Sequence, residues 1–280
     1  QLFISLVSMI SSYHQTNELV RLHQSLLTQQ ESIYEKFQSI ELLDAISKID
    51  ILRFKNTLVT LKRTIIDEQM SIEKMQKQLD LYAPKQNIPN LDASKYLYTK
   101  EEFLSQNKEE KLNQIASKQL LAQAKSSSNA YLPDLVLGLN YQKLDDPSSY
   151  GDNYSINAAI HIPLSSNDFK KAQALRISAL STNSKNTQFK IQREQEFNQK
   201  FQDYKNAQKQ LRVLNESLQD YLKSEEMIKT AYMKQYVDFN TYLQVLTEST
   251  SIQEQIIKLT YLQNEQSTIL NAIASGAIYE

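Results

Sequence analysis

The sequence predicts a mainly α-helical fold, built from very long antiparallel, coiled-coil-like helices with a single β-hairpin. The chain has 280 residues but only 3 Gly, where average usage of about 7% would give roughly twenty, so tight turns must be few. Apolar residues recur in steps of three and four along most of the chain, as they do on one face of a helix. Only in residues 130–165 does the apolar period change to two, which is typical of strands.

The composition excludes several classes of function. The 31 Lys and Arg residues balance 32 Asp and Glu residues, so there is no electrostatic reason to bind nucleic acid. Without cysteine there is no disulfide framework and no thiolate nucleophile or Cys-based metal site. His14, His23 and His161 have no carboxylates at ligand spacing, and no catalytic triad, carboxylate pair or glycine-rich loop is evident. We therefore expect no enzymatic activity, no metal and no cofactor.

Residues 1–82 are expected to form a first helical hairpin. One apolar series covers residues 2–37 and a second covers residues 51–82. The two series are out of phase across residues 38–50, which predicts a turn there and antiparallel pairing of the two helices. His23 interrupts the first series at a stripe position, where a packing or interface role is more common than chemistry.

A linker and a third helix are expected next. Residues 83–98 contain Pro84 and Pro89, and two prolines so close together cannot lie inside a helix. Residues 99–129 are expected to form one helix leading to the hairpin. Its start carries the capping-box pattern of Thr99 and Glu102, in which the hydroxyl and the carboxylate satisfy free backbone N–H groups.

Residues 130–165 are expected to form the β-hairpin, with two different faces. One face collects apolar and aromatic side chains: Leu135, Leu137, Leu139, Tyr141, Tyr154, Ile156, Ala158, Ile160 and Ile162. The other face carries mostly polar side chains, among them Asn140, Gln142, Ser155, Asn157 and His161. Each run spans about 10 residues, the length of a tilted strand that crosses a bilayer.

Residues 166–275 are expected to form a second helical hairpin, and residues 276–280 a C-terminal tail that begins at the helix-capping Gly276. The two helical hairpins look like copies of one another. Their turns align when Ile49-Asp-Ile-Leu52 is set against Leu243-Gln-Val-Leu246. The match rests on the apolar pattern and on the shared order of helix, turn and helix.

At this point the chain resembles the TolC-type outer-membrane efflux protein family. The resemblance is carried by the strand start Ala130-Tyr-Leu-Pro-Asp-Leu135, by the strand end Ile160-His-Ile-Pro-Leu164, and by the turns at residues 47–52 and 240–246. It implies an α-barrel protomer whose β-hairpin contributes to a trimeric transmembrane β-barrel. The apolar face of the hairpin would then contact lipid, and the polar face would line the lumen.

The resemblance also implies surroundings and partners. It places the protein in the outer membrane of a Gram-negative-type cell, extending into the periplasm as a homotrimer. A periplasmic adaptor protein would dock at the helical turns and connect the channel to an inner-membrane pump, so that substrates pass through passively. The turn residues Asp44, Asp50, Asp238 and Gln244 would lie at the periplasmic entrance, where the uncharged Gln244 argues against a complete acidic ring.

One departure from the family leaves an alternative open. Family members carry two β-hairpins per protomer, and this sequence shows one, so three chains supply too few strands to close a barrel. We therefore expect that further sequence, including another hairpin, precedes Gln1. The alternative is a soluble coiled-coil scaffold or a periplasmic adaptor, in which the hairpin is incidental.

Overall fold

The computed structural model divides the chain into two compact units. Unit 1 comprises Gln1–Gln106 and Gln195–Glu280, and unit 2 comprises Asn107–Glu194. The structure describes residues 2–38, 45–82, 88–91, 95–106, 108–129, 133–143, 153–162 and 166–276.

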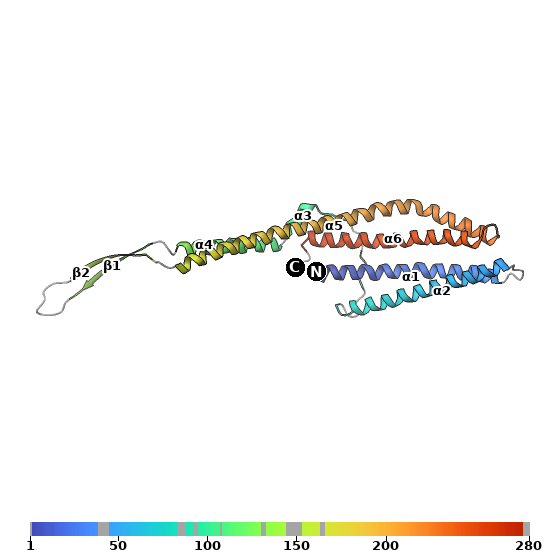
Figure 1. Ribbon diagram of the computed structural model, residues 1–280, viewed down its shortest axis with the longest axis horizontal. Helices are drawn as coiled ribbons and strands as arrows, with labels where there is room; N and C mark the ends of the chain where they lie inside the picture. The colour runs from blue at the N-terminus through green and yellow to red at the C-terminus, as the bar shows by residue number, and fades with distance from the viewer. Residues whose placement is uncertain are drawn as a thin grey trace. The chain divides into compact units, whose positions relative to one another are not determined.

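The described residues form six helices and one two-stranded antiparallel sheet (Figure 1). The elements in chain order are α1 (Leu2–Gln38), α2 (Ala45–Leu79), α3 (Lys100–Ser105), α4 (Lys108–Asn129), β1 (Asp134–Gln142), β2 (Asn153–His161), α5 (Ser166–Met233) and α6 (Phe239–Ala274). The fold class predicted from the sequence is confirmed. None of the described helices combines the length and the apolar character needed to cross a bilayer.

In unit 1 the long helices run side by side in the order α2, α1, α6 and α5 (Figure 1). Their heptad-like apolar stripes meet in two clusters, one towards each end of the unit. The first cluster joins the start of α1 to the end of α6, α3 and α5 through Val7, Phe103, Phe197 and Ile269. The helices therefore pack through side chains that the sequence spaces three and four residues apart.

One predicted helix differs in the structure. The single helix expected over residues 99–129 is two helices, because α3 buries Phe103 in the core of unit 1 while α4 belongs to unit 2. The capping box of Thr99 and Glu102 is present at the start of α3. Helix α1 ends at Gln38 and α2 begins at Ala45. Residues 39–44, within the segment where the sequence predicts a turn, lie outside the described residues.

In unit 2 small side chains bring α4 close to the first part of α5. Ala124, Ala172 and Ala179 are buried, and the Ser117 hydroxyl donates a hydrogen bond to the Ala179 carbonyl over 3.3 Å. Several large apolar side chains of the same two helices remain exposed: Leu112, Ile115, Leu121, Ile177, Leu180 and Ile191. The two helices therefore bury mainly small residues against each other.

Candidate functional site

The register of the β-hairpin places its apolar residues on one face. Residues directly opposite one another in an antiparallel pair point to the same side of the sheet. The pairs on this face are Leu135 with Ile160, Leu137 with Ala158, Leu139 with Ile156, and Tyr141 with Tyr154. The two tyrosine rings lie 5.0 Å apart between centroids. Ile162 follows the end of β2.

The opposite face is mostly polar. Its pairs are Val136 with Ala159, Gly138 with Asn157, and Asn140 with Ser155, and Gln142 and His161 lie on the same face. Val136 is an exposed apolar residue on this side. No Lys, Arg, Asp or Glu occurs in residues 135–142 or 154–161.

The apolar face of the hairpin is not covered by any described part of this chain. Leu135 is 63% exposed, Ile156 is 78% exposed and Leu139 is 82% exposed. Because an isolated two-stranded hairpin is only marginally stable in water, a face of this kind needs a partner surface beyond the described residues.

At one end of unit 1, aromatic rings join the two helical hairpins. Phe54 of α2 lies 5.3 Å from Phe239 and 5.9 Å from Tyr34 of α1, measured between ring centroids. Tyr232 of α5 stacks on Tyr242 of α6 at 4.9 Å. Burial raises the pKa of Tyr242 to about 12, although the hydrogen bond from Gln30 lowers it. This cluster joins α1 and α2 to α5 and α6 at one end of the unit.

The predicted entrance residues Asp50 and Gln244 lie on α2 and α6, two of the helices that form this cluster. Burial, followed by the negative charge of Asp50, raises the pKa of Tyr232. Arg53, which contacts Asp50 at 3.8 Å, also donates a hydrogen bond to Asn240 of α6 over 3.3 Å. Gln244 is exposed and donates to Glu248. Asp44 lies outside the described residues.

Comparisons with solved structures identify the fold. The structure matches the outer-membrane channel OprN with a TM-score of 0.71 and 15% identity, over 99% of this chain and 67% of that one. It matches the outer membrane protein VceC of Vibrio cholerae with a TM-score of 0.66 and 13% identity, over 98% of this chain and 67% of VceC. The open-state MtrE outer membrane channel of Neisseria gonorrhoeae matches with a TM-score of 0.65 and 15% identity, over 98% of this chain and 65% of MtrE.

The chain has the fold of these outer-membrane channels. The resemblance drawn from the sequence is thereby confirmed at the level of fold. The chain spans about two thirds of the length of the channels that it matches. No protein-family model matches the sequence, and a comparison with curated proteins finds no match either.

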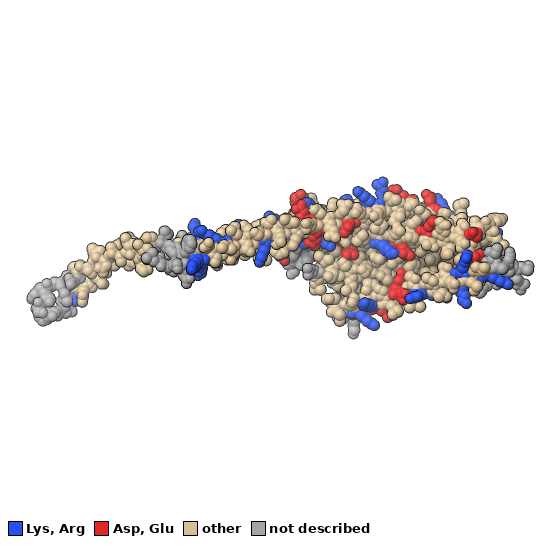
Figure 2. Space-filling view, in the orientation of Figure 1, with Lys and Arg blue, Asp and Glu red and all other residues tan. Residues whose placement is uncertain are grey.

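Within this channel fold, the surface of unit 1 carries charges of both signs. Lys and Arg side chains alternate with Asp and Glu side chains over the visible face of the helices (Figure 2). Most of the described ion pairs join residues three or four apart on one helix, such as Arg212 with Glu216. This mixed surface agrees with the net charge of −1.

The turn between α5 and α6 uses a residue that the sequence did not single out. Gln235 has a φ of 60°, a left-handed conformation in which glycine is common. The Tyr236 N–H donates to the Ala231 carbonyl over 2.8 Å, which closes the end of α5. Asp238 then caps α6 by accepting a hydrogen bond from the Thr241 N–H over 2.7 Å.

The Asp238 cap predicts a pH-dependent contribution to stability. Hydrogen bonds from the backbone and side chain of Thr241 lower the pKa of Asp238 below its ordinary value of 3.8. The stabilisation of the folded state by the Asp238 charge is therefore fully present above pH 3.8, and it is lost as the pH falls through the lower pKa of the folded state. We expect Asp238→Asn, which keeps a capping side chain, to lower Tm more at about pH 6 than at about pH 2.5. Equal shifts in Tm at both pH values would contradict this assignment.

Two buried polar residues interrupt the apolar stripe of α1, and sequence reasoning did not find their partners. The Gln30 side chain donates a hydrogen bond to the Tyr242 hydroxyl of α6 over 2.7 Å. His23 contacts one carboxylate from α2 and another from α6. The only sequence signal was a polar residue at an apolar stripe position, which indicates a buried hydrogen bond without naming its partner.

Proposed function

We propose that this chain forms the wall of an outer-membrane channel that continues into the periplasm as a helical tunnel, through which exported substrates pass passively. The two-faced hairpin is the observation that supports this function best. One face is apolar and exposed, and the other is mostly polar, as required of a strand pair between lipid and a water-filled lumen. The channel fold of the matched structures supports the same reading.

The hairpin functions only together with other strands. In lipid nothing satisfies the backbone groups of an unpaired strand edge, so the edges of β1 and β2 must pair with further strands. A homotrimer in the outer membrane supplies such neighbours. The face set of Leu135, Leu137, Leu139, Tyr141, Tyr154, Ile156, Ala158, Ile160 and Ile162 then contacts lipid. Asn140, Gln142, Ser155, Asn157 and His161 line the lumen.

An exposed apolar seam on α2 supports contact between copies of the chain. Its members are separated by three, four or seven residues, the spacing of a coiled-coil interface. They are Ile49, Leu52, Val59, Ile66 and Met70. In the trimer this seam packs against a helix of the neighbouring protomer, which removes the exposed apolar surface from water.

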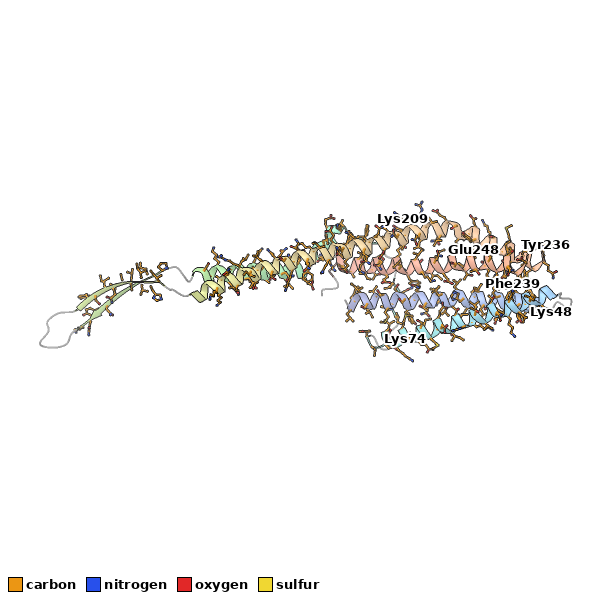
Figure 3. All side chains as sticks on the ribbon, in the orientation of Figure 1. Lys48, Lys74, Lys209, Tyr236, Phe239 and Glu248 are labelled. Carbon is orange, nitrogen blue, oxygen red and sulfur yellow. The ribbon has the colours of Figure 1, made fainter. Side chains whose placement is uncertain are left out.

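The turn end of unit 1 is the periplasmic entrance. Lys48, Tyr236 and Phe239 mark this end in Figure 3, where Tyr236 is exposed and Phe239 is buried. Asp44, Asp50, Asp238 and Gln244 belong to the same entrance. A periplasmic adaptor protein docks at these turns and connects the channel to an inner-membrane pump.

Single-channel recording tests this function. The natural full-length protein that contains these residues, reconstituted in a planar bilayer, is expected to give discrete current steps. Because these residues include no Cys, a cysteine at Asn157 is expected to react with a charged thiol reagent and reduce the current. A cysteine at Leu137 is the matched control and is expected to leave the current unchanged. Absence of steps would favour the soluble scaffold instead. Block through Leu137→Cys alone would contradict the assignment of the two hairpin faces.

A further inference from the structure

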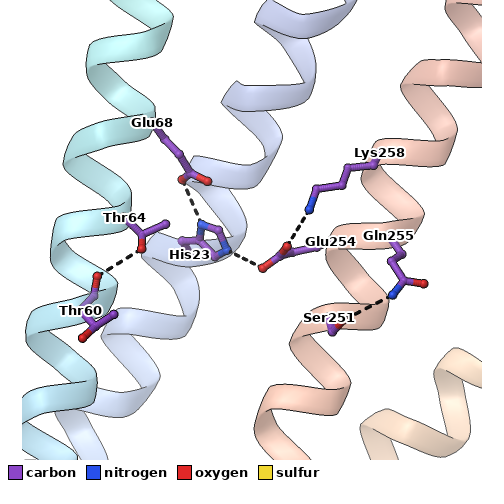
Figure 4. A network of polar contacts seen from close by, with 8 residues as sticks. All are labelled: His23, Thr60, Thr64, Glu68, Ser251, Glu254, Gln255 and Lys258. Atoms are coloured by element: carbon purple, nitrogen blue, oxygen red, sulfur yellow. Dashed lines mark hydrogen bonds and ion pairs between the residues drawn. The ribbon is translucent and has the colours of Figure 1, made fainter.

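A buried histidine links three helices of unit 1. The His23 side chain of α1 is 7% exposed. Its Nδ1 atom lies 2.9 Å from Oε2 of Glu68 on α2, and its Nε2 atom lies 3.2 Å from Oε1 of Glu254 on α6. Lys258 of α6 contacts the other oxygen of Glu254 at 2.9 Å. Figure 4 shows these four residues in one network.

Only one protonation state of the ring satisfies both contacts. A neutral imidazole carries one N–H, so its second nitrogen would direct a lone pair at a carboxylate oxygen. The imidazolium donates from both nitrogens. Its charge and that of Lys258 then balance the two carboxylates. Burial would raise the pKa of Glu254, but the hydrogen bonds and charges of Lys258 and His23 hold it below its ordinary value, so Glu254 stays an acceptor.

The bridge spans a groove between α2 and α6. This groove has a volume of about 520 Å³, and His23 and Glu254 line it together. Short hydroxyl side chains from both helices form much of its walls: Thr57, Thr60, Thr64, Thr247, Thr250 and Ser251. Leu61 of α2 and Leu243 and Leu246 of α6 also line the groove. Because the groove is open between the two helices, the polar bridge at His23 joins α2 to α6 through α1 at this level.

We propose that His23 is a proton-controlled latch that holds α6 against the α1 and α2 pair. Histidine is the side chain whose charge ordinarily changes between about pH 5 and pH 8. When the proton is lost, the remaining N–H stays with Glu68, the closer carboxylate, and the Nε2 lone pair faces Glu254. The contact with α6 then becomes repulsive and the groove opens. This inference rests on contacts inside unit 1 and does not depend on the proposed channel function.

The other two histidines of the chain lack this arrangement. His14 is partly exposed, and its Nε2 atom contacts the Pro89 carbonyl at 2.9 Å. His161 lies on the polar face of the β-hairpin and is exposed. His14→Gln therefore serves as a matched control, because it removes a titrating ring from the same helix without touching the bridge.

Distance measurement between spin labels tests the latch. Labels are attached to cysteines introduced at the exposed positions Arg63 of α2 and Gln255 of α6, and the labelled protein is diluted with unlabelled protein. Between about pH 5 and about pH 8.5, we expect the distance distribution to lengthen or broaden in the parent and in His14→Gln. In His23→Gln we expect no change with pH. A parent distance that does not change with pH, or a change that persists in His23→Gln, would overturn the proposal.

A second readout needs no substitution at His23. The ¹⁵N chemical shifts of its ring report directly whether both nitrogens carry protons. We expect two protonated nitrogens at the low end of the pH range, and loss of one proton over the same pH interval in which the label distance changes. The midpoint pH of proton loss from the ring and the midpoint pH of the change in label distance should agree. If they differ by more than about one pH unit, the latch assignment is wrong, even where His23→Gln does not fold.

Discussion

Replacing Phe54 with alanine is expected to lower the free energy of unfolding by about 3–5 kcal/mol. Phe54 is 2% exposed, and its ring contacts the rings of Tyr34, Phe239 and Tyr242. Removing it leaves a cavity where α1, α2 and α6 meet. Long helices packed along their whole length cannot shift locally to fill such a cavity, so the lost contacts are not replaced. Urea-induced unfolding in detergent, followed by circular dichroism, measures the loss.

The adjacent Lys55 provides the control for this experiment. It is exposed, so Lys55→Ala is expected to change the free energy of unfolding by no more than about 0.5 kcal/mol. Phe54→Leu keeps most of the side-chain volume and is expected to cost about 1.5 kcal/mol or less. If Phe54→Ala were no more destabilising than Lys55→Ala, the aromatic cluster would not hold the two hairpins together.

Replacing Leu137 with arginine is expected to cost about 2–4 kcal/mol of membrane stability if this residue lies near the bilayer midplane. Leu137 lies near the middle of β1 and is 69% exposed on the apolar face of the hairpin. A guanidinium at this position must leave water for lipid, and the chain offers no acidic residue in the described strand segments 135–142 and 154–161 to pair with it. Refolding into lipid vesicles over a series of denaturant concentrations measures this cost.

Asn157→Arg is the matched control for Leu137→Arg. Asn157 lies opposite Gly138 on the other face of the same hairpin, where an added cation would meet the aqueous lumen. We expect this variant to insert within about 1 kcal/mol of the parent. Equal losses for the two variants, or a membrane-bound trimer that tolerates Leu137→Arg, would show that the apolar face does not contact lipid.

Much of the fold follows from local pattern in the sequence. Scarce glycine and heptad-like apolar spacing predict the long helices, because both depend only on residues that are close together in the sequence of one helix. Strict alternation around Leu137 and Ile156 predicts both strands and the residues that share a face, since the period of a strand is two. The observed pairing of Leu139 with Ile156 brings those residues together.

What the sequence did not predict depends on contacts between distant segments. The break between α3 and α4 follows from Phe103 packing against Phe197, whose rings lie 5.0 Å apart. The partners of His23 lie on helices far from it in sequence. A polar residue in an apolar stripe shows that a partner is needed, but only the packing of α2 and α6 against α1 identifies it.

The central claim is that one face of the hairpin contacts lipid and the other contacts water. The accessibility of each strand position to oxygen, which concentrates in lipid, and to a water-soluble nickel complex tests this claim most directly. Single spin labels are attached to cysteines introduced one at a time at residues 135–142 and 154–160. The 280 residues contain no native cysteine that would have to be removed first. In lipid vesicles we expect oxygen accessibility to peak at Leu135, Leu137 and Leu139, and nickel accessibility to peak at the alternate positions such as Asn140. Uniform accessibility, or peaks with the opposite phase, would contradict a hairpin that separates lipid from a water-filled lumen.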